Sequence, residues 1–147
     1  MVQLHVERTI AASPDRVFRW LADPANFTTP LASSIGFTAG YVGGSPPAVG
    51  AVREVNGFGN AWFREVITAY NPPRGYSYRV VRAFPTVDHR GATMTFTAVA
   101  EGTHVEWESC FTYPVRVGGK LMDAVSSRLV RRSFLAILGR CAEALER

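Results

Sequence analysis

The pattern of apolar positions predicts a long helix at the end of the chain. The segment 117–147 contains no proline, and apolar residues recur along its second half at spacings of three and four. These spacings are typical of a helix that lies on a core. The apolar side consists of Val130, Phe134, Ile137, Leu138, Cys141 and Leu145. In the first half Leu121, Val125 and Leu129 fall on a different side, so either the helix bends near Arg128–Arg132 or its first half meets a second apolar surface.

Most of the preceding chain alternates between apolar and polar residues, which indicates half-buried strands. Strands are predicted at 2–10, 35–42, 50–56, 61–69, 76–82, 92–100 and 103–113, with a loop at 85–90. Two short helices should follow the first strand, because Ser13 is a good N-cap and Pro14 suits the first helical position. The connections between the later strands are too short for parallel crossovers, so the sheet should be antiparallel.

Charges predict the register of the hairpin around 57–60. A three-residue loop pairs Arg53 with Glu65 and Glu54 with Arg64, whereas a two- or four-residue loop would place Arg53 opposite Arg64. We therefore predict the three-residue loop, with one ion pair facing inward and the other facing solvent. If the inner side is the one that carries Trp62, then Glu54 and Arg64 form the partly buried pair. Arg64 would then either bind an anionic ligand group or hold a structural ion pair.

These elements predict an α+β fold in a single domain that spans residues 1–147. One long helix is too narrow to cover a flat sheet of about seven strands, so the sheet should curve around it. A curved sheet around one helix tends to leave space between them, and small ligands bind in such spaces.

Charge and cysteine content exclude several classes of function. The net charge is +4, but the densest basic cluster, Arg128, Arg131 and Arg132, comes with no nucleic-acid-binding signature. We read it as a solvated helix face and expect no nucleic-acid partner. Cys110 and Cys141 fit no metal-binding spacing. No signal peptide or membrane-length apolar run is visible, so we expect a cytoplasmic protein without stable membrane insertion. A homodimer is left open.

No catalytic motif stands out. His5, His89 and His104 are each expected to be solvated, and no triple of histidine and carboxylate has metal spacing along the chain. We therefore expect neither a metal nor a cofactor. The polar residues that alternation allows to point inward are Arg8, Glu54, Arg64 and Tyr78.

Several short motifs, in order, resemble a known superfamily. They are Val6–Ile10, Ala12–Phe18, Val49–Gly50, Glu65–Val66, Tyr70–Pro73, Gly102–Trp107 and the C-terminal amphipathic helix. Together they are similar to the START-like, birch-pollen-allergen-like (SRPBCC) superfamily, which includes the polyketide cyclase/dehydrase and lipid-transport family. The resemblance implies a helix-grip fold with a deep cavity between sheet and helix. Its members bind lipids, steroids, polyketides or hormones, and some are aromatases or cyclases.

We expect this chain to bind a hydrophobic small molecule, such as a lipid, a polyketide or an aromatic compound, in that cavity. The expected ligand-binding residues are Phe37, Trp62, Arg64, Tyr78, Phe96, Trp107, Phe111, Met122 and Phe134. The alternative is an enzyme of the polyketide cyclase/aromatase type that acts on a ligand in the same cavity. Binding is favoured over catalysis because no group is obviously poised for covalent chemistry. A protein-interaction module that uses the basic helix is a third hypothesis.

Overall fold

A computed structural model describes residues 1–27, 38–44, 47–56 and 61–146 of the chain. The strands are β1 (Val2–Ile10), β2 (Thr38–Tyr41), β3 (Val52–Asn56), β4 (Trp62–Asn71), β5 (Gly75–Phe84), β6 (Asp88–Val99) and β7 (Gly102–Thr112). The helices are α1 (Pro14–Ala22) and α3 (Gly119–Leu145), with short 3₁₀ turns η1 (Pro24–Phe27), η2 (Val42–Gly44) and η3 (Val115–Val117).

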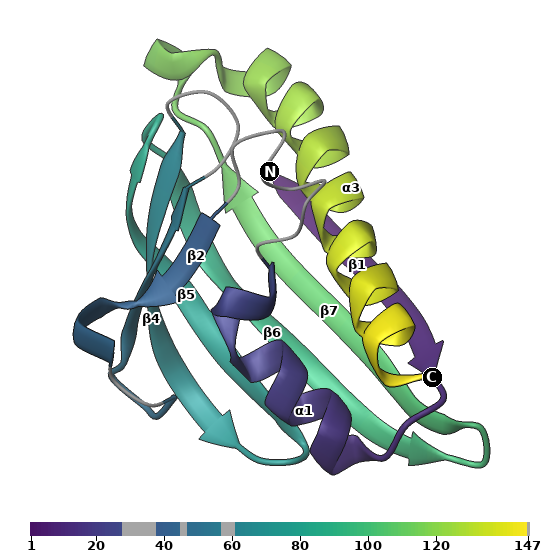
Figure 1. The fold of residues 1–147 in the computed structure, drawn as a ribbon. Coiled ribbons are helices and arrows are strands. Elements are labelled where there is room, and N and C mark those ends of the chain that lie inside the picture. Colours follow the sequence, from purple (N-terminus) through teal and green to yellow (C-terminus); the bar gives the residue numbers. More distant parts are fainter. Residues whose placement is uncertain (28–37, 45–46, 57–60, 147) are drawn as a thin grey trace.

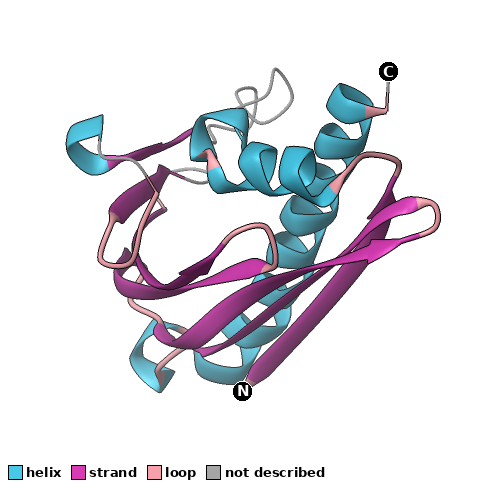
Figure 2. Ribbon diagram, turned by 90° about the horizontal axis from the view of Figure 1, so that it is seen from below, coloured by secondary structure: helices cyan, strands magenta, loops and turns pink. Residues whose placement is uncertain are grey.

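The strands form one antiparallel sheet of seven strands, in the order β1-β7-β6-β5-β4-β3-β2. Consecutive strands pair as neighbours from β2 to β7, and β1 pairs with β7. The sheet curves, and α1 and α3 lie on its concave side (Figures 1 and 2). The predicted α+β helix-grip architecture is therefore confirmed.

The start of α1 follows from its local sequence. The Ser13 hydroxyl accepts a hydrogen bond from the Arg16 N–H at 3.5 Å, and a proline occupies the first turn. The helix buries Val17, Phe18, Leu21 and Ala22. It packs against β6, β7 and α3, and Phe18 also contacts Tyr70 of β4 and Tyr76 of β5, so α1 closes one end of the concave face.

The predicted long helix is confirmed as α3, and its two halves contact different apolar clusters. In the second half, Leu138 and Cys141 are fully buried in the main core. In the first half, Met122 and Val130 pack against a separate cluster of Leu4, Phe111 and Tyr113. The first half thus meets a second apolar surface through Met122, but the shifted stripe that suggested this alternative does not: Leu121 is 74% exposed, and Val125 and Leu129 also face solvent.

One carboxylate fixes how the chain passes from β7 into α3. Asp123 is buried, and its Oδ1 accepts the Tyr113 N–H at 2.7 Å while its Oδ2 accepts the Thr112 hydroxyl at 2.9 Å. These charge-assisted hydrogen bonds join the N-terminal part of α3 to the end of the last strand. The helix is thereby anchored at the end where its apolar packing is weakest.

Candidate functional site

The hairpin of β3 and β4 has the predicted register, but the face that points inward is the opposite of the one we considered. Arg53 lies opposite Glu65, and Glu54 lies opposite Arg64. The inner pair is Arg53–Glu65, with Nε and Oε1 2.5 Å apart and the Arg53 side chain 1% exposed. The Glu54–Arg64 pair is about half exposed on the outer face.

The same alternation corrects two predicted site residues. Side chains on a strand alternate between faces, so Trp62 and Arg64 lie on the outer face once Glu65 points inward. Arg64 is therefore not at the polar end of the interior. That position belongs to Arg53.

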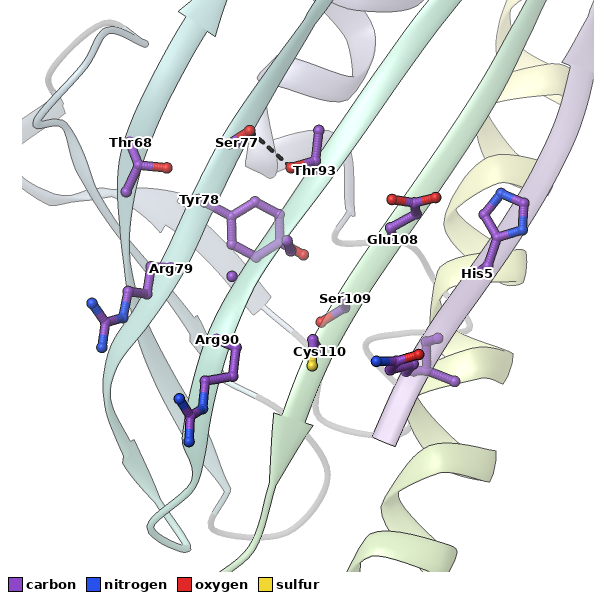
Figure 3. Close-up of a pocket in the computed structure, with 14 residues that line it drawn as sticks. His5, Thr68, Ser77, Tyr78, Arg79, Arg90, Thr93, Glu108, Ser109 and Cys110 are labelled. Atoms are coloured by element: carbon purple, nitrogen blue, oxygen red, sulfur yellow. Dashed lines mark hydrogen bonds between the residues drawn. The ribbon is translucent and has the colours of Figure 1, made fainter. Parts of the chain in front are cut away.

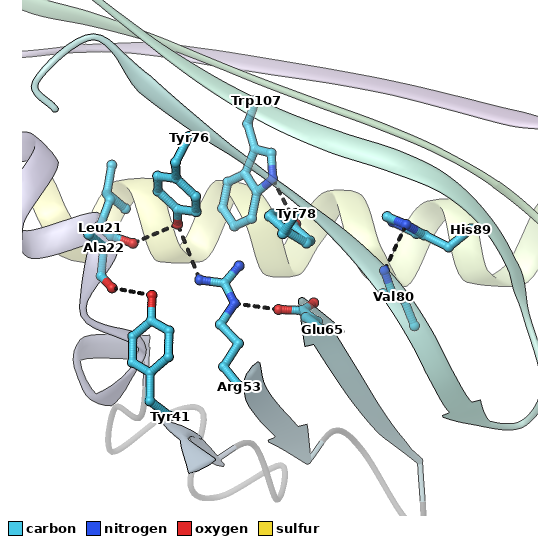
Figure 4. A network of polar contacts seen from close by, with 10 residues as sticks. All are labelled: Leu21, Ala22, Tyr41, Arg53, Glu65, Tyr76, Tyr78, Val80, His89 and Trp107. Carbon is cyan, nitrogen blue, oxygen red and sulfur yellow. Dashed lines mark hydrogen bonds and ion pairs between the residues drawn. The ribbon is translucent and has the colours of Figure 1, made fainter. Parts of the chain in front are cut away.

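Aromatic rings enclose the Arg53 guanidinium (Figure 4). Its central carbon lies 4.5 Å from the centre of the Tyr78 ring and 5.5 Å from that of Tyr76. Arg53 Nη1 donates to the Tyr76 hydroxyl at 3.3 Å, and this hydroxyl donates to the Leu21 carbonyl at 2.8 Å. The Trp107 Nε1–H donates to the Tyr78 hydroxyl at 3.0 Å. An ion pair and three polar-tipped aromatic residues thus form one connected network on the concave face.

Burial controls protonation in this network. Burial alone would lower the pKa of Arg53, but Glu65 and the two phenols more than offset it and raise that pKa well above its usual value. Burial raises the pKa of Tyr76 and, more strongly, that of Tyr78. Nearby, burial raises the pKa of Tyr41 to about 12. At neutral pH the network therefore contains a charged guanidinium and neutral phenols, of which Tyr76 donates a hydrogen bond to the Leu21 carbonyl.

His89 extends this network, contrary to its predicted place in a solvated loop. Strand β6 begins at Asp88, and a bulge at Gly91, whose φ is +127°, lets His89 and Ala92 both point inward. The Val80 N–H donates to His89 Nδ1 at 3.1 Å, so the neutral ring carries its proton on Nε2 and donates it to the Ser109 hydroxyl, 3.2 Å away. Burial, and then the charge of Arg79, lower the pKa of His89 to about 4.

The remaining predicted site residues divide between the two apolar clusters. In the main cluster Tyr78, Phe96 and Trp107 are buried, and the Phe134 ring stacks on Trp107 with centroids 3.7 Å apart. Phe111 and Met122 belong to the second cluster, under the first half of α3. Phe37 lies outside the described residues. The predicted set therefore does not form a single group.

The sequence pattern did not identify Arg53 as the inward-facing cation or His89 as an inward-facing polar residue. The register gave the ion pairs correctly, but each face of the hairpin also carries apolar residues: Val55 and Ile67 on one, Trp62 and Val66 on the other. This left the choice of face open. For His89 there was no signal, because the bulge that turns it inward interrupts the alternation.

The outer face of the sheet carries an open groove of about 690 Å³ (Figure 3). Its lining includes Ser77, Arg79, Arg90, Thr93 and Glu108, and the Ser77 and Thr93 hydroxyls lie 2.9 Å apart. This polar surface differs from the apolar interior pocket that we predicted, because it lies on the opposite side of the sheet.

Whole-chain comparison identifies the family. Residues 1–146 match the family model described as polyketide cyclase / dehydrase and lipid transport. The chain belongs to this family. The superfamily resemblance noted in the sequence is thus confirmed, and no curated protein matches the chain.

Solved structures share the fold of this family member at low sequence identity. Protein CV1439 from Chromobacterium violaceum is 19% identical, with a TM-score of 0.71 over 99% of this chain and 98% of that one. Ara h 8.0201 is 16% identical, with a TM-score of 0.62 over 95% and 97% of the two chains. DynU16, from the dynemicin biosynthetic locus, is 19% identical, with a TM-score of 0.67 over 98% of this chain and 47% of that one. Among the described residues, no helix has the length and apolar character needed to cross a membrane.

Proposed function

We propose that this family member binds a small molecule with an apolar body and an anionic or hydroxylated end. The ligand would lie between the concave face of the sheet and α3. Its apolar body would contact Trp107, Phe134 and the adjoining aromatic core, and its polar end would approach Arg53 and Tyr78. The cytoplasmic location and the homodimer considered from the sequence stay predictions.

The observation that carries this proposal is the buried Arg53 network. A fully buried guanidinium costs several kcal/mol of desolvation even when it is paired. Here it is held by Glu65 and by two phenol rings on a largely apolar face. A cation of fixed position beside aromatic walls matches a ligand that combines an apolar body with a carboxylate, phosphate or phenolate.

Binding is favoured over catalysis by the protonation of the same residues. His89 is neutral at pH 7, and its Nδ1 already accepts a backbone hydrogen bond. The raised pKa values of Tyr76 and Tyr78 make both phenols weak acids. Glu65 is engaged by Arg53 at 2.5 Å. Neither His89 nor the two phenols therefore has the pKa near working pH that suits a general base.

A polyketide cyclase or aromatase is the second candidate function. It is favoured by the Tyr76 and Tyr78 hydroxyls beside Arg53, since a cation with neutral phenol donors could stabilise an enolate. The similar fold of DynU16 is compatible with this candidate but carries no evidence about its chemistry. Incubation with a poly-β-ketone thioester tests it. A cyclised product that forms with the wild type and is lost in Tyr78→Phe, with probe binding retained, would favour the enzyme.

The binding proposal is tested with a fluorescent fatty acid and the matching fatty alcohol. The inner pair is neutralised as Arg53→Gln/Glu65→Gln, so that no unpaired charge is left buried. The outer pair, changed as Glu54→Gln/Arg64→Gln, is the matched control, because it has the same residue types in the same hairpin. We expect the inner double variant to bind the acid at least about tenfold more weakly, equivalent to about 1.4 kcal/mol. Alcohol binding should change much less.

Three results would count against this proposal. They are an absence of probe binding by the wild type at micromolar concentrations, equal loss in both double variants, or equal loss for acid and alcohol. Native mass spectrometry of freshly purified protein gives an independent measurement. A copurified apolar molecule, displaced by the fluorescent acid, would support the carrier role.

A further inference from the structure

A cluster of imidazoles and carboxylates forms on the outer face where the first and last strands pair. The register places Glu7 opposite Glu106 and Thr9 opposite His104, and His5 is on the same face of β1. Alternation turns all of these side chains away from the core, and each is at least partly exposed. No segment of the sequence contains this cluster, because its members come from two strands, β1 and β7, that are far apart along the chain.

The separations of the ligand atoms are those of a metal site. His5 Nε2 lies 3.4 Å from Glu106 Oε1 and 3.9 Å from Glu7 Oε2, and one nitrogen or oxygen of each residue falls within 4.8 Å of the others. His104 Nε2 lies 3.3 Å from Glu7 Oε2. In tetrahedral zinc sites with bonds of about 2.0–2.1 Å, neighbouring ligand atoms are about 3.4 Å apart. His104 lies outside this group of three, so a four-ligand site would require its ring to move toward His5 and Glu106.

Charge and orientation provide a separate argument. Two carboxylates directly opposite each other on paired strands repel one another, and a divalent cation between them would remove this cost. The Thr9 hydroxyl lies 3.0 Å from His104 Nδ1, which directs Nε2 of that ring toward Glu7. An outer hydrogen bond of this kind is how proteins orient histidine ligands.

We propose that His5, Glu7, His104 and Glu106 form a Zn²⁺ site that links β1 to β7. Two imidazole nitrogens with two carboxylate oxygens suit Zn²⁺ better than Mg²⁺ or Ca²⁺, which prefer oxygen ligands alone. This departs from the expectation of no metal, which considered only spacing along the chain. The bound ion would stabilise the pairing of the first and last strands, since binding to the folded form shifts the unfolding equilibrium.

The test is titration of untagged full-length protein with ZnCl₂, followed by calorimetry and thermal unfolding, with MgCl₂ in parallel. His5→Gln/Glu106→Gln removes two ligands, and Glu101→Gln, in the exposed β6–β7 turn, is the control. Cys110→Ser tests the nearby thiol on β7. We expect the wild type to bind one Zn²⁺ per chain with micromolar affinity or tighter. The double variant should bind Zn²⁺ at least tenfold more weakly. Neither single variant should change the affinity. Mg²⁺ should give no comparable rise in Tm.

Cobalt substitution reports the geometry independently of stability. Co²⁺ at this site should show the visible absorption bands of tetrahedral coordination, without a thiolate charge-transfer band. The proposal fails if the wild type binds no Zn²⁺, if the double variant binds it equally well, if Cys110→Ser abolishes binding, or if Mg²⁺ binds as tightly. The cluster would then be a set of surface hydrogen bonds.

Discussion

Arg53 and Arg64 form matching ion pairs in one hairpin, yet water reaches only one of them well. The Arg53 and Glu65 side chains are 1% and 11% exposed, against 45% and 48% for Arg64 and Glu54. An exposed pair adds little stability because water and salt screen it. A buried pair has already lost its hydration, so each partner depends on the other.

Removing one partner should therefore have very different effects at the two positions. Arg53→Gln leaves the Glu65 carboxylate without its buried partner and should lower the free energy of unfolding by about 3–5 kcal/mol. Arg64→Gln should lower it by less than about 1 kcal/mol. Urea denaturation of both variants measures the difference. Similar losses would mean that Arg53 is better hydrated than its position indicates.

His89 makes stability depend on pH through a buried neutral ring. Its pKa is about 4 in the folded protein, below the usual 6.5. The unfolded chain therefore binds a proton more readily than the folded one. The stabilising contribution is complete above about pH 6.5 and is lost as the pH falls toward 4.

We expect wild-type stability to fall more steeply than that of His89→Gln between pH 6.5 and 4. The difference in slope should approach 1.4 kcal/mol per pH unit at most. His104→Gln, on the outer face, is the control, and zinc is left out of the buffer. Parallel profiles for the wild type and His89→Gln would show that the ring protonates as easily when folded as when unfolded.

At the scale of elements, α3 is anchored unevenly along its length. Its second half buries Ile137, Leu138 and Cys141 in the main core, whereas its first half leaves Leu121 and Val125 in solvent. The first half is attached mainly through Met122, Val130 and the Asp123 hydrogen bonds. Helix stability in proteins comes largely from packing of this kind.

Truncation along α3 should reveal this difference. Leu138→Ala removes a fully buried side chain and should cost about 2–5 kcal/mol, while Leu121→Ala should stay within about 0.5 kcal/mol. Thermal and urea unfolding of both variants provide the comparison. A large loss for Leu121→Ala would indicate that the exposed stripe is covered in solution.

Considered as a whole, the molecule has its core at one end of the sheet. The main cluster joins β1, β4, β5, β6 and β7 to both helices, whereas β2 is a short edge strand. The Arg53 network reaches from this cluster, which contains Tyr76, Tyr78 and Trp107, toward the edge of the sheet at β3 and β2. The proposed ligand would therefore bind where the strongly packed part of the sheet meets its lightly packed edge.

Amide hydrogen exchange should follow this difference in packing across the sheet. Amides of β1, β6 and β7 should exchange most slowly, and those of β2 and β3 should exchange first, because local opening exposes little apolar surface there. A bound fatty acid should slow exchange in β3, β4 and β5 more than in β1. Uniform protection along the sheet, or slowing confined to β1, would contradict the proposed location of the ligand.

The sequence determined those features that depend on local patterns and on pairing between neighbours. Alternation and the proline-free C-terminal segment predicted the antiparallel sheet and the single long helix. Opposite charges fixed the hairpin register of Arg53 with Glu65. Inward aromatics such as Tyr78 and Trp107 were also identified, because each alternates with polar neighbours in a regular strand.

Only the tertiary structure decided which face of the hairpin points inward. A period of two leaves two equivalent choices, and packing against α1 and the core selected Arg53 rather than Arg64. The bulge at Gly91 turned His89 inward against the simple alternation. The pairing of the first and last strands brought His5 and Glu106 together. In each case the deciding contact joins residues far apart in sequence, where local periodicity carries no information.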